Sequence, residues 1–131
     1  MTETFVDSSY WLARLNARDV LYLPARKIIP PPRLVTTLAV LLEVMDALSA
    51  PQHRESALEF WDAIGNNSHV TVIFLEPMLI QRAIKLFRTR PDKAWSLTDC
   101  VSFVVMTERG LTEALSADHH FEQAGFRILL K

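Results

Sequence analysis

The stretch VTVIFLEPMLIQRAIKLF, residues 70–87, carries a strand pattern and a helix pattern in one continuous run. Residues 70–75 are apolar and rich in β-branched side chains, which is typical of a strand. Pro77 suits the first turn of a helix, and apolar residues then recur at helical spacing from Leu79 to Phe87. A strand followed directly by an amphipathic helix is the repeating unit of an α/β fold.

The same alternation extends along the chain in both directions. Strands are expected at 3–7, 33–36, 70–75, 113–117 and 127–130, and helices at 8–18, 37–48, 51–64, from 77 onward and at 96–109, with a helical turn at 118–123. The proline-rich segment 19–32 is expected to be a helix turn followed by a loop. Helix 37–48 is apolar on nearly every side, which predicts that it is buried. This order predicts one domain, residues 1–131, with a central parallel sheet of about five short strands flanked by helices in three α/β/α layers.

Composition and length narrow the class of protein. The chain has 131 residues, of which 50% are hydrophobic and 22% charged, as expected for a compact globule. No apolar run reaches the roughly 18 residues that would span a bilayer, and the first residues lack the basic start of a signal peptide. A cytoplasmic protein without a membrane anchor is therefore expected.

Cysteine and glycine usage excludes several kinds of site. Cys100 is the only cysteine, so neither an internal disulfide nor a cysteine-cluster zinc module can form. The three glycines, at 65, 110 and 125, are too far apart for a dinucleotide fingerprint or a phosphate-binding P-loop.

Two acids stand where predicted strands end. Asp7 follows the first strand and Asp118 follows the fourth. In an open parallel sheet, ligands bind beyond the carboxyl ends of the strands, so both side chains are expected in one crevice. Each acid also has a structural alternative, because aspartate is a common helix cap and turn former.

Two further acids are expected in helices. Glu43 lies in the apolar helix 37–48, where a buried carboxylate needs a compensating partner, unless it shares a solvated edge with Asp46. Asp99 completes the pattern Ser96-x-x-Asp99, whose structural role is a capping box. The combination is more informative than any single acid, because four carboxylates in one crevice require cations.

These motifs together resemble the PIN-domain nucleases, and among them the VapC-like toxins of bacterial toxin–antitoxin pairs. The matching segments are Phe5-Val-Asp7-Ser-Ser9, Thr36-Thr37 with the later Leu-Leu-Glu43-Val, Ser96-Leu-Thr-Asp99-Cys100, and Leu115-Ser-Ala-Asp118-His-His-Phe121. They cover essentially the whole chain in order. The resemblance implies a PIN-like fold and an acidic quartet at Asp7, Glu43, Asp99 and Asp118.

The resemblance also implies a role for each residue. Asp7 and Asp118 would bind Mg²⁺ or Mn²⁺ directly, Asp99 would be a ligand or hold a coordinated water, and Glu43 would orient the attacking water. Ser116 stands where the family often has threonine. His120 stands where the family often has another aspartate, and this departure either weakens a second metal position or supplies a hydrogen bond to the substrate.

The two histidines after Asp118 are expected to be neighbours of the site. Adjacent side chains on a helical turn point about 100° apart, so both imidazoles cannot readily chelate one ion. Mg²⁺ and Mn²⁺ also prefer hard oxygen ligands.

The resemblance implies RNA as substrate, hydrolysed with the help of metal ions that lower the pKa of water and neutralise phosphate charge. The net charge is −1, from 14 Lys+Arg and 15 Asp+Glu. Without the four acids of the quartet, 15 − 4 = 11 acids remain against 14 basic residues, so the rest of the protein has a net charge of +3, which can favour RNA. Arg82, Lys85 and Arg88 are candidate phosphate contacts, although the solvated face of a helix is their simpler interpretation. Other candidates are Arg14, Arg18, Arg90 and Lys93.

Three other functions stay open on sequence grounds. A haloacid-dehalogenase-like phosphatase would need an aspartate where Ser9 stands, and a phospho-acceptor signalling domain would need a lysine near the pocket. A catalytically idle PIN-like module that binds RNA or protein is favoured by His120 alone. The resemblance further implies a VapB-like antitoxin partner and a homodimer, for which Tyr10 and Trp11 could form a contact face, although packing in the core is the simpler role for both.

Overall fold

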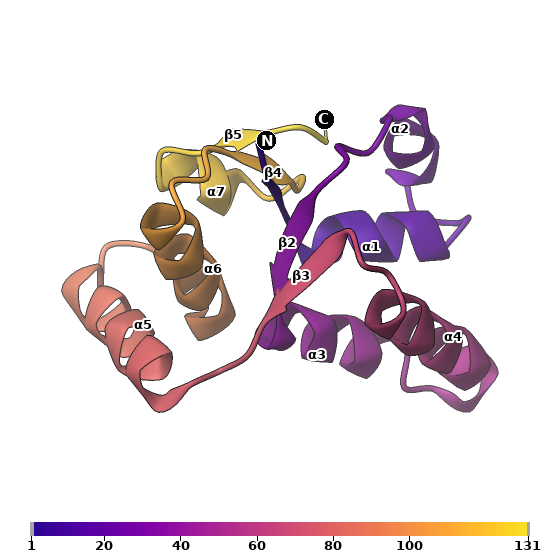
Figure 1. The fold of residues 1–131 in the computed structure, drawn as a ribbon, viewed down its shortest axis with the longest axis horizontal. Helices are drawn as coiled ribbons and strands as arrows, with labels where there is room; N and C mark the ends of the chain where they lie inside the picture. Colours follow the sequence, from indigo (N-terminus) through magenta and orange to yellow (C-terminus); the bar gives the residue numbers. More distant parts are fainter. Residues whose placement is uncertain (1, 131) are drawn as a thin grey trace.

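The computed structural model describes residues 2–130 and shows an alternating series of strands and helices (Figure 1). In chain order these are β1 (Thr4–Val6), α1 (Ser8–Leu15), α2 (Tyr22–Lys27), β2 (Leu34–Thr37), α3 (Leu38–Ala47), the short 3-10 helix η1 (Pro51–His53), α4 (Arg54–Gly65), β3 (Val70–Ile73), α5 (Pro77–Thr89), α6 (Leu97–Glu108), β4 (Glu113–Leu115), α7 (His119–Gln123) and β5 (Arg127–Ile128). The α/β prediction is confirmed.

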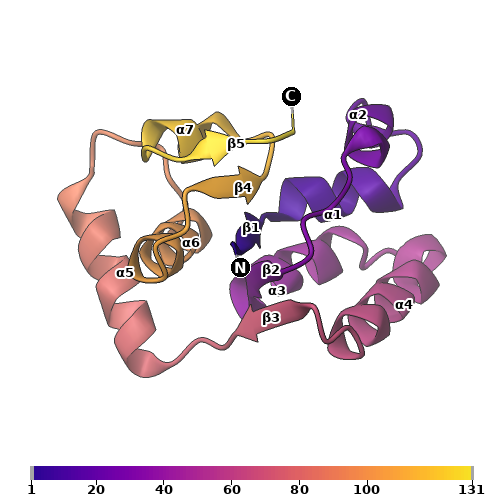
Figure 2. The same cartoon turned by 45° about the horizontal axis from the view of Figure 1, so that its top comes forward.

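The five strands form one sheet in the order β3-β2-β1-β4-β5, and every neighbouring pair is parallel (Figure 2). The first strand of the chain is therefore central, because each parallel pairing requires a helical crossover and the crossovers proceed outward on both sides of β1. Parallel pairing also places the carboxyl ends of all five strands at one edge of the sheet.

Alternate residues of the central strands face opposite layers of helices. Phe5 and Val35 pack into a core formed with α5, α6 and α7, whereas Val6 and Leu34 pack against α1 and α2. In Figure 1, α6 lies between the sheet and α5, so α5 reaches the sheet mainly through α6. The result is the predicted three-layer α/β/α arrangement.

The ends of three adjacent strands bring distant segments together. β1 ends at Val6, directly before Asp7, and β4 ends at Leu115, three residues before Asp118. β2 ends at Thr37, whose Oγ1 accepts a hydrogen bond of 3.1 Å from the backbone N–H of Val40 and so caps α3. Since β1 lies between β2 and β4, the segments that follow these strands start side by side.

Three helix predictions need correction. α3 is not buried all round, because Leu42 is 45% exposed and Asp46 faces solvent. On α4, apolar periodicity predicts an inner stripe of Ala57, Leu58, Trp61 and Ile64, but Phe60 is buried in place of Leu58 and Trp61, which are exposed. On α5, Phe87 is exposed, unlike its expected inward position. Periodicity alone did not show how narrow the packed face of each helix is.

Several segments differ in length from their predictions, and two of these differences have a structural explanation. The strand expected at 70–75 ends at Ile73, and Phe74 is 66% exposed beyond it, because β3 is an edge strand with a neighbour on one side only. The helix turn expected within 19–32 is the two-turn helix α2, which tolerates Pro24 because its backbone nitrogen lies in the first turn, where N–H groups have no helical acceptor.

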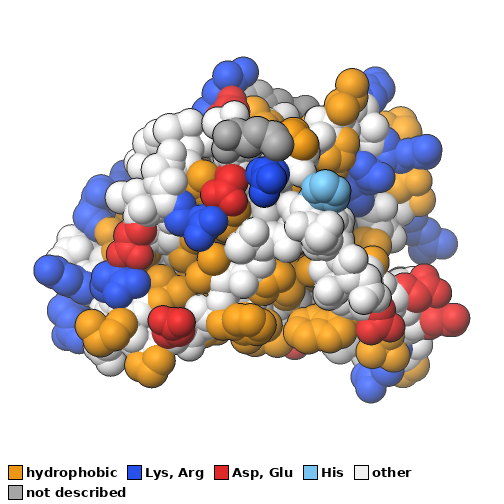
Figure 3. Space-filling model, viewed as in Figure 1, with side chains coloured by type: hydrophobic (Ala, Val, Ile, Leu, Met, Phe, Trp, Pro, Cys, Tyr) orange, Lys and Arg blue, Asp and Glu red, His pale blue; other side chains and the backbone are white. Residues whose placement is uncertain are grey.

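The face of the molecule seen in Figure 3 has an apolar margin. Figure 3 shows hydrophobic side chains gathered along the lower edge of the face in view, over β3 and the linker to α5. Phe74, Met78 and Trp61 are among the exposed hydrophobic residues. Within residues 2–130, no helix combines the length and the apolar character needed to cross a membrane.

Candidate functional site

Asp7 lies at the end of the central strand and is almost fully enclosed, with 6% of its surface exposed. It stands at the N-cap position of α1, but its side chain caps no helix N–H. Its Oδ2 instead accepts hydrogen bonds from the hydroxyls of Ser9, at 3.0 Å, and Ser116, at 2.9 Å. The structural alternative for Asp7, a helix cap, is therefore not what the side chain does.

Burial raises the pKa of Asp7 above its ordinary value, because a charged carboxylate loses hydration in the interior. Hydrogen bonds from Ser116, Ser8 and Ser9 oppose this effect, and the negative charge of Asp99 adds to it. The net direction is upward. A cation next to Asp7 would reverse it by stabilising the ionised form.

Ser116 and Ser9 tie the first and fourth strand ends together. Ser116 is fully buried, and its Oγ accepts the backbone N–H of Asp118 at 3.0 Å while donating to Asp7. The Ser9 Oγ accepts the backbone N–H of Ala117 at 3.1 Å. These contacts fix the backbone on which Asp118 stands relative to Asp7.

Asp118 caps α7 and faces the same region. Its Oδ1 accepts the backbone N–H of His120 at 2.9 Å, and the cap leaves the carboxylate half-buried. The capping role expected as an alternative is real, yet it uses only part of the accepting capacity of the carboxylate.

Asp99 likewise has a structural role and a second contact. Ser96 and Asp99 form a reciprocal capping box at the start of α6, with hydrogen bonds of 2.9 and 3.1 Å. Asp99 Oδ2 also lies 3.1 Å from His120 Nδ1, which is itself 3.4 Å from Asp118 Oδ1. One imidazole nitrogen therefore lies between the carboxylates of α6 and α7.

Glu43 lies on α3, within electrostatic reach of the other three acids. Burial is the main cause of its raised pKa, and the negative charges of Asp7, Asp99 and Asp118 raise it further. A hydrogen bond from the Ser8 side chain acts in the opposite direction. That all three acids act on Glu43 means that the structure brings the predicted quartet into one neighbourhood.

The two histidines lie closer together than their sequence positions suggested. Their ring centroids are 4.5 Å apart, and one potential ligand atom from each of Asp118, His119 and His120 lies within 4.8 Å of the others. The expectation that adjacent imidazoles point away from one another is wrong here, because both residues lie in the first turn of α7 and turn toward the carboxylate that caps it. His119 is exposed, whereas His120 is half-buried.

The quartet carries negative charge that no lysine or arginine of residues 2–130 neutralises through a salt bridge. The ion pairs of Asp99 and Asp118 within that range are with His119 and His120 only. Carboxylate and hydroxyl oxygens are the donors that Mg²⁺ and Mn²⁺ prefer. The donor set therefore fits a hard divalent cation.

The predicted phosphate contacts lie outside this cluster, on α5. Arg82 and Lys85 line a pocket between α5 and α6, and Arg82 pairs with Glu108 at 2.6 Å. Arg88 is exposed on the same helix but does not line that pocket. The structure thus separates the basic residues of α5 from the acidic residues at the strand ends.

The sequence pattern favours Ser8 and Ser9 as caps of the first helix, and this interpretation missed their effects on the acids. Both lie inside α1, where Ser9 donates a hydrogen bond to Asp7 and Ser8 lowers the pKa of Glu43. Their position in the sequence could have predicted these contacts. Two hydroxyl residues directly after an acid at a strand end fall in the first turn of the next helix, close to that carboxylate.

Comparison with known proteins gives a consistent family match. The family model described as PIN domain matches residues 4–127. The 23S rRNA-specific endonuclease VapC20 of Mycobacterium tuberculosis, in strains CDC 1551 / Oshkosh and ATCC 25618 / H37Rv, is 30% identical over 124 residues, which cover 93% of this chain and 94% of the relative.

Two solved structures share the fold. The crystal structure of Mycobacterium tuberculosis VapC20, described as a Sarcin-Ricin loop cleaving toxin, superposes with a TM-score of 0.90 at 28% identity and covers 98% of this chain and 99% of that one. The structure of VapBC-1 from nontypeable Haemophilus influenzae gives a TM-score of 0.65 at 11% identity, covering 98% and 97% of the two chains, and at that identity it shows the fold alone.

Proposed function

The chain belongs to the PIN-domain family, and on that premise we propose that it is a VapC-like toxin, a metal-dependent endoribonuclease that hydrolyses RNA phosphodiester bonds. The observation that carries the proposal is the convergence of four carboxylates on one neighbourhood without a lysine or arginine salt bridge among residues 2–130. Its similarity to a 23S rRNA-specific endonuclease supports RNA as the substrate class.

In this proposal, Asp7, Asp99 and Asp118 hold Mg²⁺ or Mn²⁺, and Glu43 orients the attacking water. When bound, the ion would act as a Lewis acid, lowering the pKa of water and offsetting charge on the scissile phosphate. Ser116 and Ser9 hold the Asp7 carboxylate in a fixed orientation by donating to one of its oxygens. Such supporting hydrogen bonds keep a ligand ready for its ion.

The substrate contacts come from two places. His120 lies beside Asp99 and Asp118, where its second ring nitrogen can bond the RNA. Arg82, Lys85 and Arg88 provide positive charge for phosphates farther along the strand. Ser116 contributes indirectly, because it orients the Asp7 carboxylate.

Cleavage of RNA in the presence of Mn²⁺ tests the proposal directly. Asp7→Asn keeps a side chain of the same size and an oxygen acceptor for the two serines, but removes the charge. We expect the native chain to cleave RNA, chelation by EDTA to abolish cleavage, and Asp7→Asn to retain less than about one-hundredth of the activity. Asp62→Asn, an exposed acid on α4, is the matched control. Equal cleavage by the native chain and Asp7→Asn would refute the proposal.

A catalytically idle PIN-like module that binds RNA or protein is the second candidate. His120 favours it, because a histidine stands between two carboxylates at the position where the family often has an aspartate. RNA binding without Mn²⁺-dependent cleavage would identify this function in place of the nuclease.

We propose that a VapB-like antitoxin binds the groove of ≈ 380 Å³ beside α1 and α4. Tyr10, Trp11, Arg14 and Phe60 are among its lining residues, and Trp11 Nε1 is buried without a hydrogen-bond acceptor within residues 2–130. Because that nitrogen is enclosed, the partner would contact the exposed lining residue Arg14 instead. Arg14→Ala should weaken copurification with the product of the neighbouring reading frame.

A cytoplasmic homodimer of single-domain chains, residues 1–131, completes the proposal. Its contact face would be the apolar margin at Phe74, Met78 and Trp61. Light scattering should show a dimer for the native chain and a monomer for Phe74→Ser. Phe87→Ser, which removes an exposed ring on α5 in the same way, should remain a dimer. A native chain that is monomeric at all concentrations would refute the homodimer.

A further inference from the structure

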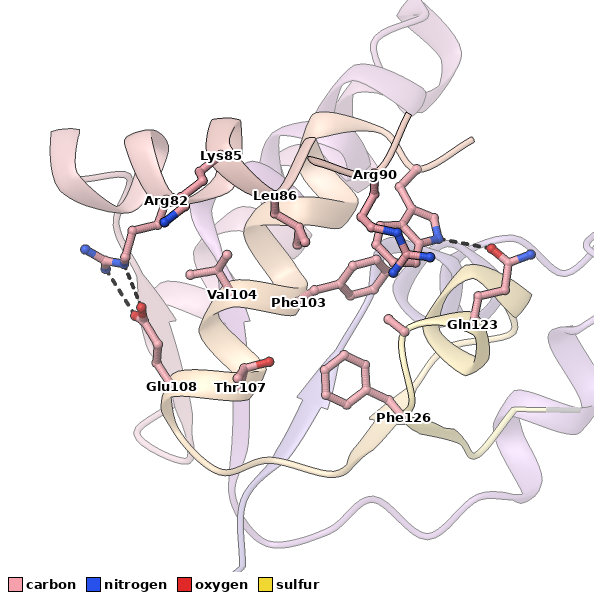
Figure 4. A pocket seen from close by; sticks show the side chains of 12 residues that line it. Arg82, Lys85, Leu86, Arg90, Phe103, Val104, Thr107, Glu108, Gln123 and Phe126 are labelled. Atoms are coloured by element: carbon pink, nitrogen blue, oxygen red, sulfur yellow. Dashed lines mark hydrogen bonds and ion pairs between the residues drawn. The ribbon is translucent and has the colours of Figure 1, made fainter. Parts of the chain in front are cut away.

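A pocket of ≈ 470 Å³ lies between α5, α6 and the end of α7 (Figure 4). We propose that this α5–α6 pocket binds one unpaired nucleotide of the RNA, with the base against its apolar wall and the phosphate at Lys85. The inference rests on the proposed ribonuclease function and adds to it a second contact site, separate from the acidic cluster.

The wall of the α5–α6 pocket suits a flat, largely apolar ring. Leu86, Val104 and Phe126 line it and are each only half-buried, so they present apolar surface to the opening. The ring of Phe126 lies 5.7 Å from that of Phe103, tilted by 36°, and leaves one aromatic face toward the pocket in Figure 4. Bases bind protein aromatic rings by stacking with little dependence on sequence. The volume falls within the range of small-molecule sites.

Positive charge lines the α5 side of the pocket. Arg82 is paired with Glu108 and Arg90 with Asp92, whereas Lys85 makes no salt bridge within residues 2–130. Figure 4 shows Lys85 on the α5 rim above the apolar wall. The apolar wall can contact the base of a nucleotide, and the Lys85 ammonium can contact its phosphate.

Two lining residues of the pocket are close in the chain to the acidic cluster. Trp95 Nε1 donates a hydrogen bond of 3.0 Å to Gln123 Oε1. Trp95 directly precedes Ser96, which caps the helix that carries Asp99, and Gln123 ends α7, whose cap is Asp118. Since α7 has five residues, it spans about 7 Å at 1.5 Å per residue. A strand with its scissile phosphate at the carboxylates can therefore place a flanking nucleotide in the pocket.

Binding of RNA to an uncleaving chain tests this inference. In the Asp7→Asn background, fluorescence anisotropy would follow a labelled, short single-stranded RNA of randomised sequence over a series of salt concentrations. Phe126→Leu keeps apolar volume but removes the aromatic face, and we expect roughly tenfold weaker binding. Lys85→Ala should weaken binding and reduce the slope of log K against log salt by about 0.7, the value for one phosphate contact with a single strand.

Lys27→Ala is the matched control, because Lys27 is also an exposed helical lysine but lies on α2, outside the pocket. Its salt slope should equal that of the parent. If Phe126→Leu lowers the melting temperature, Thr107→Trp, at an exposed lining position, blocks the pocket from outside and should weaken binding in the same way. The inference would be overturned if Lys85→Ala and Thr107→Trp both bound RNA with the affinity of the parent chain.

Two further measurements separate the possible failures. Cleavage by chains with native Asp7 tests the ribonuclease function alone: if the native chain cleaves RNA and the pocket variants show unchanged KM, the pocket inference is wrong and the ribonuclease function stands. Titration with a free nucleoside monophosphate distinguishes the source of the ligand. Saturable binding of the mononucleotide that does not compete with the RNA would show a pocket for a free nucleotide and would overturn its assignment to RNA.

Discussion

Ser116 Oγ lies 2.9 Å from Asp7 Oδ2 and donates a hydrogen bond to it across 109 residues of sequence. The same oxygen accepts the backbone N–H of Asp118 at 3.0 Å. One fully buried hydroxyl thus connects two of the proposed metal ligands, one at the end of β1 and one after β4.

Ser116→Ala should therefore reduce metal binding and cleavage together. Loss of the donor leaves the buried Asp7 carboxylate less stabilised, so the pKa of Asp7 should rise further and protons should compete better with the ion. We expect a roughly 10- to 100-fold loss of Mn²⁺ affinity, measured by isothermal titration calorimetry, and a similar loss of RNA cleavage. Ser116→Thr keeps the hydroxyl and should retain most of both. Equal affinity in the alanine and native chains would contradict the role given to Ser116.

The capping box of α6 allows the two roles of Asp99 to be separated. Asp99→Asn retains an oxygen that can accept the Ser96 N–H but loses the charge, so the melting temperature should change little while cleavage is lost. Ser96→Ala removes a cap acceptor and should lower the free energy of unfolding by about 1 kcal/mol. That variant should still cleave RNA below its melting temperature. Urea unfolding and cleavage assays on both variants measure stability and activity separately. The separation of the two roles would be contradicted if Asp99→Asn were the less stable of the two variants.

The fold was predictable because its elements have strong local patterns. The β-branched run that begins at Val70 and the helix opened by Pro77 were identified by type, and only their ends moved. The errors concern packing, as at Trp61, which is exposed because Ala57, Phe60 and Ile64 form the packed face of α4. Tertiary contacts decide which face of a helix packs, and a single sequence does not encode them locally.

The acidic cluster was predictable for a different reason. Asp7 directly follows β1 and Asp118 follows β4 by three residues, and a parallel sheet places the ends of these strands at one edge. The α5–α6 pocket was not predictable in this way, because its lining residues come from three helices and the segments beside them, without a shared motif. Phe126 and Trp95 have no relation in sequence that would place them at one opening.

We expect the residue at position 120 to affect how strongly the cluster binds divalent ions. His120→Asp adds a carboxylate beside Asp99 and Asp118, so repulsion should lower the melting temperature of the metal-free chain. The same change should increase the stabilisation by Mn²⁺, because cation affinity rises with the number of charged ligands. Thermal melts with and without Mn²⁺ measure both effects. His120→Asn, of similar size to aspartate but neutral, is the control, and an equal Mn²⁺ response in the two variants would exclude a charge effect.

The raised pKa values of Asp7 and Glu43 predict how the stability of the metal-free chain depends on pH. The ordinary values are 3.8 and 4.5, and the folded-state values are higher, so the folded chain binds more protons than the unfolded chain as pH rises from those values. Stability should consequently fall with increasing pH through this window and level off above the folded-state pKa values. Urea unfolding at a series of pH values in EDTA measures this dependence.

Asp7→Asn should flatten that dependence, since the amide does not titrate, and it should raise stability at neutral pH by removing a desolvated charge. Glu59→Gln, an exposed acid on α4, controls for the loss of one negative charge. Mn²⁺ should stabilise the native chain increasingly as pH rises, because an ion held by the carboxylates favours their ionised forms. Its effect should be largest where the metal-free chain is least stable. A metal-free native chain whose stability rises steadily from pH 4 to neutral pH would show that these carboxylates are already compensated, and the need for a cation at this edge of the sheet would disappear.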